Sequence, residues 1–202
     1  TNDRWVKTRD DIIKLMKVNK YDSADNIIYE YSEVIQNLID LMQYTADTSN
    51  LILDPSITSY YLISLNVKVI PQLSENISKM AAKALLLLSE KDEVISEQEK
   101  LELFILQGSA NRLSEQLLYN YSVLDDLAVK NGEYKKYDDR QDIVNLIQPR
   151  LLSNFYSIVG DNSRDIALKV IFDEELELSN RYMQAYNDNY NELHEDLTIR
   201  DV

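Results

Sequence analysis

The stretch Phe172–Leu197, FDEELELSNRYMQAYNDNYNELHEDL, carries the most regular pattern in the chain. Its mostly apolar residues recur in alternating steps of four and three, which is the spacing of one face of a helix in a bundle. The positions of this face are Phe172, Leu176, Ser179, Met183, Tyr186, Tyr190, Leu193 and Leu197. We expect a helix over about 164–200, roughly 55 Å long at about 1.5 Å per residue.

Upstream of this stretch, boundary signals divide the N-terminal part into two helical blocks. The first block is expected over about 3–53, with a weak point at 19–23 where the helix would break or bend. Asp54-Pro55 predicts the start of a second helix, because Asp is a good N-cap and proline is favoured at the first helical position. This helix should run to about residue 90 and bend at Pro71, which has no amide hydrogen to donate.

A third helix is predicted between two clear end signals. Ser96 and Glu99 have the spacing of a capping box, which marks a helix start. The apolar pattern ends near residue 130, and the following Asn131-Gly132 suits the left-handed backbone that often closes a helix. The polar stretch 133–140 then predicts an exposed loop.

A fourth helical segment is expected over about 139–159, with Pro149 inside it, and Gly160–Ser163 marks the break before the last helix. Two long terminal helices around two shorter ones would form an antiparallel bundle of four main passes. The fourth segment either caps the far end of this rod or shares a pass with the last helix, and the pattern does not decide which.

The composition supports the same fold class. The chain of 202 residues has only 3 Gly and 3 Pro, where average usage predicts roughly 14 and 10. Folds rich in strands need many more turns. Hydrophobic residues make up 45% of the chain, enough for a packed core. We therefore predict one all-α domain over residues 1–202, an elongated antiparallel up-down helical bundle with long first and last helices.

Charge and residue counts exclude several classes of function. With 21 Lys plus Arg against 35 Asp plus Glu, the net charge is −14, which disfavours a nucleic-acid partner. The chain has no Cys and a single histidine, His194, and the position that a Glu-x-x-His metal pair would require is Asn191. No phosphate-binding or nucleophile motif occurs. We expect no catalytic residue, no metal and no cofactor, so this part of the protein is not predicted to be an enzyme.

One corner of the chain could bind a ligand. The segment 50–62, NLILDPSITSYYL, combines an amide, an acid and two adjacent tyrosines between two helices. Asn50, Asp54, Tyr60 and Tyr61 are therefore candidate residues for a small-ligand or partner site at the tip of the rod. The alternative is structural, with Asp54 capping the helix and the tyrosines wedging the helices apart.

Two arginines beside the apolar stripes are further candidates. Arg112 and Arg181 could hold a carboxylate or another anion in a groove of the bundle. Alternatively, each pairs with a glutamate on its own helix. Three tyrosines spaced by four residues would form either an aromatic ligand site or a buried seam: Tyr182, Tyr186 and Tyr190.

The stretch 44–73, YTADTSNLILDPSITSYYLISLNVKVIPQL, resembles a segment of the helical input domains of bacterial transmembrane receptors. Those receptors are methyl-accepting chemotaxis proteins, sensor histidine kinases and diguanylate cyclases. The resemblance rests on four short motifs in order: Ser49-Asn50-Leu51, Asp54-Pro55, Ser59-Tyr60-Tyr61-Leu62 and Ile70-Pro71. It covers about 30 residues, while the remainder matches only as amphipathic helix.

This resemblance implies an extracytoplasmic domain that senses a ligand or another stimulus and passes a helix displacement through the membrane. It implies a periplasmic location in an inner-membrane protein, whose whole chain could carry a kinase or cyclase domain. The chain starts at Thr1 without a signal peptide and has no apolar run of 18 residues, so we expect an excised fragment. The resemblance implies that two membrane helices flank this fragment in the whole protein. The expected partner is an unidentified small molecule or protein, and a homodimer is left open.

Two other functions compete with this interpretation. An intracellular helical scaffold or adaptor would bind a partner helix in a groove and would lack flanking membrane segments. A bundle enzyme with carboxylate-metal chemistry would need inward-facing Glu and His residues, and the predicted stripes contain none.

Overall fold

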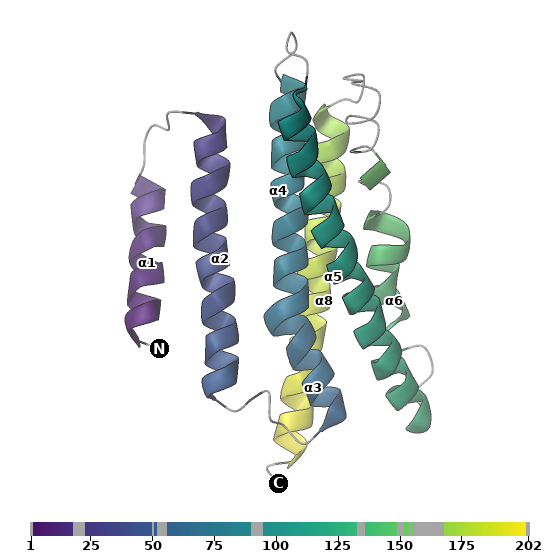
Figure 1. Ribbon diagram of the computed structural model, residues 1–202. Coiled ribbons are helices and arrows are strands. Elements are labelled where there is room, and N and C mark those ends of the chain that lie inside the picture. The colour runs from purple at the N-terminus through teal and green to yellow at the C-terminus, as the bar shows by residue number, and fades with distance from the viewer. Residues whose placement is uncertain are drawn as a thin grey trace.

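Figure 1 shows the computed structural model, which describes residues 2–17, 23–49, 51, 56–89, 95–132, 136–148, 152, 153, 155 and 168–200. Within these ranges the chain is helical and contains no strand, so the predicted all-α class is confirmed. In chain order the elements are α1 (Asn2–Lys17), α2 (Ala24–Thr48), α3 (Ile57–Ser64), the π-helix η2 (Leu65–Val69), α4 (Ile70–Ser89), α5 (Glu97–Lys130), α6 (Asp138–Asp142), the π-helix η3 (Ile143–Ile147) and α8 (Leu168–Arg200). None of these described helices is long and apolar enough to span a membrane.

The helices run alternately up and down along one axis, as an up-down bundle requires (Figure 1). The segment α6–η3 rises beside α5 as a pass of its own, which resolves the question that the sequence left open. The first block supplies another pass because it divides into α1 and α2, whose described ends flank the predicted weak point at 19–23. Among the described helices the number of passes is therefore even, and the start of α1 and the end of α8 both lie in the lower half of Figure 1.

The second helix begins two residues later than predicted. Its N-cap is Ser56, whose hydroxyl accepts a hydrogen bond from the amide of Ser59 at 3.3 Å, so the predicted N-cap role of Asp54 is wrong. Asp54 itself lies outside the described residues. The helix then passes through η2, where the amide of Ile70 bonds to the carbonyl of Leu65, directly before Pro71. A widened turn there relieves the clash of the proline ring with the preceding turn, so the helix is irregular directly before the residue at which a bend was predicted.

The central helix α5 follows the sequence signals closely. The capping box of Ser96 and Glu99 is present, and the helix ends where predicted. Gly132 has φ of 85°, which a residue with a side chain rarely adopts. The buried face of α5 packs with α4 and α8 into one core, in which each fully buried Leu contributes about 1.5–3 kcal/mol. The largest fully buried side chains include Leu62, Leu73, Ile77, Met80, Leu117, Tyr121 and Tyr182.

The predicted loop over 133–140 is only partly correct. Residues 133–135 lie outside the described ranges, but Tyr137 is 1% exposed and α6 begins at Asp138. The ring of Tyr137 stacks on Tyr121 of α5, with ring centroids 5.8 Å apart. This aromatic contact buries Tyr137, although the polar composition of the stretch predicted an exposed loop. Most of 149–167, including the predicted break at 160–163, also lies outside the described residues.

The buried face of α8 differs from the predicted one by one residue, a rotation of about 100°. The residues that point into the core are Ile171, Leu178, Tyr182, Ala185, Asn189 and Leu193. Of the eight predicted positions only Leu193 is buried, and four are exposed: Phe172, Leu176, Met183 and Tyr190. The prediction failed because the true face contains a small residue and an amide, whereas the neighbouring stripe is more apolar.

Candidate functional site

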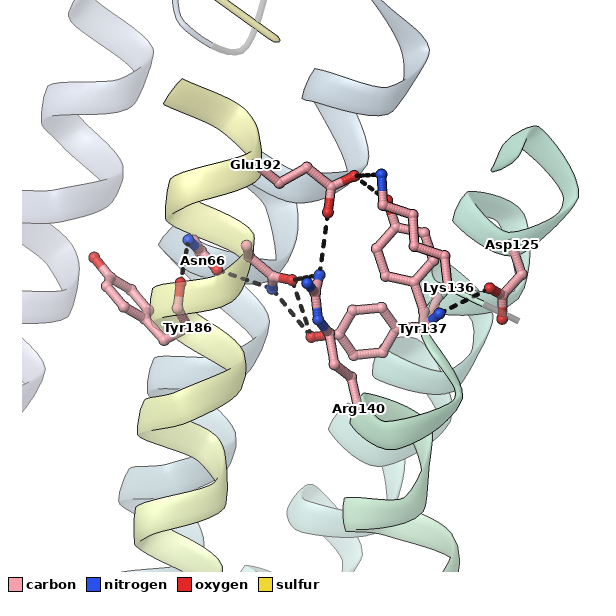
Figure 2. Close-up of polar contacts among 9 residues, drawn as sticks. Asn66, Asp125, Lys136, Tyr137, Arg140, Tyr186 and Glu192 are labelled. Carbon is pink, nitrogen blue, oxygen red and sulfur yellow. Dashed lines mark hydrogen bonds and ion pairs between the residues drawn. The ribbon is translucent and has the colours of Figure 1, made fainter. Parts of the chain in front are cut away.

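A buried polar network crosses the lower half of the bundle, where η2, α5, α6 and α8 meet (Figure 2). We call it the Asn189 cluster. Its members are Asn66, Tyr121, Tyr137, Arg140, Asn189 and Glu192. Polar groups in a core are stable only when their hydrogen bonds are made, so their partners define how the helices can pack.

Asn189 of α8 is the centre of this cluster and is 0% exposed. Its amide nitrogen donates to Asn66 Oδ1 and to the hydroxyl of Tyr121, both at 3.0 Å. Its carbonyl oxygen accepts from Arg140 Nη1 at 2.6 Å. One side chain on α8 therefore joins η2, α5 and α6.

Asn66 extends the contact to the backbone of α8. Its amide nitrogen donates to the carbonyl of Tyr186 at 3.0 Å, while its own carbonyl accepts from Asn189. Asn66 lies in the π-helical turn η2, and such turns often mark functional positions. The turn and the last helix are thus connected by two hydrogen bonds from one side chain.

Charged groups close the cluster toward solvent. The carboxylate of Glu192 forms ion pairs with Arg140 Nη1 at 3.3 Å and with Lys136 Nζ at 3.0 Å. It also accepts a hydrogen bond from the hydroxyl of Tyr137. The guanidinium carbon of Arg140 lies 4.9 Å from the ring centroid of Tyr137, within cation–π range.

Asp125 of α5 fixes the start of α6. Its carboxylate accepts from the backbone amide of Tyr137 at 3.0 Å and from the side-chain amide of Gln141. This holds Tyr137 beneath the guanidinium of Arg140, so α5 positions the residues by which α6 contacts α8.

A second, smaller polar group lies next to η3. Gln148 is 2% exposed and bonds to Ser114 of α5, and its carbonyl oxygen accepts from the hydroxyl of Tyr182 of α8 at 2.8 Å. This connects the end of η3 with α5 and α8, one level further up the bundle. Tyr182 is therefore a buried polar link, while Tyr190 is 57% exposed, so the three tyrosines of α8 do not converge on one site.

Tyr121 and Tyr182 are held in their neutral forms. Burial raises the pKa of Tyr121 to about 12, although the hydrogen bond to Asn189 and the charge of Arg140 lower it. Burial also raises the pKa of Tyr182. Neutral hydroxyls can donate and accept hydrogen bonds but are poor acids and bases near pH 7. No group of His, Asp and Glu suited to a metal ion occurs among the described residues.

The N-terminal end of α3 is also attached to α8. The hydroxyls of Ser56 and Ser59 both lie within hydrogen-bond distance of Asp196 Oδ2, and the Ser56 contact measures 3.3 Å. A carboxylate that accepts two hydroxyl hydrogen bonds is a charge-assisted contact, stronger than a neutral one.

The residues predicted from sequence lie elsewhere. Asn50 and Asp54 are outside the described ranges. Tyr60 is 47% exposed and makes an edge-to-face contact with Tyr61, which in turn contacts Tyr119 of α5. The hydrogen bond with Tyr119 is the main cause that raises the pKa of Tyr61.

The two predicted arginines are not brought together with this aromatic group. Arg112 and Arg181 are exposed positions on α5 and α8, and neither takes part in the Asn189 cluster. The sequence analysis missed the residues of the cluster itself. The available signal was a spacing of four, three and four through Leu178, Tyr182, Ala185 and Asn189, which ends on an amide.

Comparison of the chain with protein-family models, with curated proteins and with solved structures gave no match. The functional argument therefore rests on the fold, on the Asn189 cluster and on the resemblance of the stretch 44–73.

Proposed function

We propose that this chain is the sensing domain of a transmembrane signalling receptor, located in the periplasm, and that displacement of α8 carries its signal. The observation that carries the proposal is where the receptor-like stretch attaches. Within 44–73, Ser56 and Ser59 bind Asp196, and Asn66 binds the backbone of α8 and Asn189. The part of the sequence that resembles receptors therefore binds the C-terminal half of the last helix.

The direction of the chain supports the same function. The start of α1 and the end of α8 both lie in the lower half of Figure 1, the start of α1 higher than the end of α8, and both point toward the same end of the bundle. Besides its apolar core contacts, α8 makes hydrogen bonds with fixed partners, so a displaced helix exchanges one discrete arrangement for another. Coupling free energies of allosteric systems are typically about 1–3 kcal/mol, the scale of one or two such bonds.

The first test is to determine the gene sequence on both sides of this chain. Hydrophobic segments of about 20 residues on both sides are expected, since that length spans a bilayer. Their absence on both sides would contradict the proposal and favour an adaptor. The adaptor alternative is supported by apolar side chains of α1 and α2 that are partly exposed and could contact a partner helix. Trp5 is 49% exposed and Tyr31 is 45% exposed.

The second test uses the absence of cysteine in the chain. In the full receptor, the double variant Ser59→Cys, Asp196→Cys joins α3 to α8 when oxidised. The control double variant Asn76→Cys, Ser109→Cys joins α4 to α5, where these side chains are hydrogen-bonded at 2.9 Å. Oxidation should change methylation, kinase or cyclase output reversibly in the first variant and not in the control. An unchanged output with a complete cross-link would show that α8 does not move.

A further inference from the structure

A cleft of about 750 Å³ lies at the end of the bundle opposite the Asn189 cluster. Its lining comes from the first turns of α2, the second half of α4 and the first half of α5, all in the upper half of Figure 1. Small-molecule sites typically have volumes of about 300–1,000 Å³, so the cleft has the size of a ligand site.

The lining of the cleft is partly apolar and partly polar, and two of its large apolar side chains are exposed. Tyr29 of α2 is 67% exposed and Ile105 of α5 is 62% exposed. Leu86 and Leu103 lie deeper and continue the apolar surface. A ligand that covered these side chains would remove apolar area from water, which favours binding by about 25 cal/mol per Å².

Most of the charged groups in the cleft are already satisfied. Lys83 forms an ion pair with Glu102, and Glu99 accepts from the backbone of Ser96 in the capping box. Two groups of opposite sign remain, Asp25 on α2 and Lys79 on α4. Across the described part of the chain neither makes an ion pair, and Glu75, one turn before Lys79, interacts with it only through its charge.

We infer that this cleft binds a zwitterion with an apolar body, namely an apolar α-amino acid or a short peptide of such residues. Asp25 receives the ammonium group, Lys79 receives the carboxylate, and Tyr29 and Ile105 cover the apolar side chain. A simple carboxylate would leave Asp25 without a partner, and a simple amine would leave Lys79 without one. A ligand with both charges therefore matches these two groups better than a ligand with one charge.

Such a ligand would bridge α2 and α4, and its binding is a property of this domain alone. Only the consequence for signalling rests on the proposed function, because α4 continues through η2 to the contacts with α8. The two proposals can therefore fail separately.

The test is calorimetric titration of the purified domain with L-leucine, L-isoleucine, L-methionine, L-phenylalanine and leucyl-leucine. At least one should bind and should raise the unfolding temperature in proportion to its concentration. For L-leucine the matched probes are 4-methylpentanoate, which lacks the ammonium group, and 3-methylbutylamine, which lacks the carboxylate. Each matched probe should bind at least about tenfold more weakly, as expected for loss of one charge-assisted contact.

Variants locate the site. Lys79→Met and Asp25→Asn should each weaken binding of the best probe by roughly tenfold or more. The matched controls are Lys68→Met in η2 and Asp47→Asn on α2, both exposed positions outside the cleft, which should bind as the parent does. No binding by any probe at 10 mM, equal binding of the single-charge probes, or equal losses in the control variants would overturn the inference.

Discussion

Replacing Asn189 by leucine tests whether the cluster holds the bundle together. The side chain is fully buried, and leucine has a similar branched shape but no polar atom. Leucine leaves Asn66 Oδ1 and the Tyr121 hydroxyl without their partner, while Arg140 keeps its ion pair with Glu192. A buried neutral group that loses its partner costs about 1–3 kcal/mol, so two such groups predict a loss of about 2–6 kcal/mol.

The measurement is urea unfolding followed by circular dichroism, with the parent chain, Asn189→Leu and Asn187→Leu. Asn187 is exposed on the same helix, and its replacement should change the free energy of unfolding by less than about 0.5 kcal/mol. The slope with urea should stay constant, since both states expose the same surface. A loss below about 1 kcal/mol for Asn189→Leu, with an unchanged slope, would refute the reasoning that this amide determines the packing of α8.

Three further outcomes are expected. In Tyr121→Phe, the free energy of unfolding should fall less steeply between pH 10 and 12 than in the parent, because the folded parent keeps the Tyr121 proton that the unfolded chain loses. The difference should reach roughly 2–3 kcal/mol, measured by unfolding across that pH range. In Glu75→Gln, the free energy of unfolding at pH 7 should rise by roughly a few tenths of a kcal/mol, since burial raises the pKa of this half-exposed carboxyl. The gain should vanish in acid, where the carboxyl is protonated. An equal gain at both pH values would point to packing instead. In Ser59→Ala, loss of the bond to Asp196 should cost about 1.5–3 kcal/mol, and no change in urea unfolding would show that this contact is dispensable.

Local signals predicted the helix ends well. The capping box of Ser96 and Glu99 and the left-handed Gly132 depend on residues within a few positions of each other, so the sequence states them directly. The irregularity before Pro71 is local for the same reason, because proline removes one particular hydrogen bond. The burial of Tyr137 could not be predicted in this way, since it depends on a ring 16 positions earlier, that of Tyr121.

The candidate site was missed for a related reason. Scoring by apolarity selects Phe172 and Met183 of α8 and rejects Asn189, although Asn189 is the buried residue. An amide can occupy a core position only when partners from other elements satisfy it, and those partners come from positions 66, 121 and 140. Such an arrangement is a property of the assembled bundle, so no single segment of the sequence contains it.

The Asn189 cluster also limits the positions that α8 can take. A slide of one helical turn, about 5.4 Å, would bring Ala185 or Leu193 opposite Asn66, and neither can form its hydrogen bonds. One arrangement of α8 is therefore fully satisfied, and any displaced one must expose the cluster to water or break it. Within the proposed function, the resting state is the satisfied one, and a stimulus moves α8 only if it favours the displaced arrangement by at least the free energy of the broken bonds. The cluster would then set the threshold of the receptor, while its stimulus acts elsewhere in the bundle.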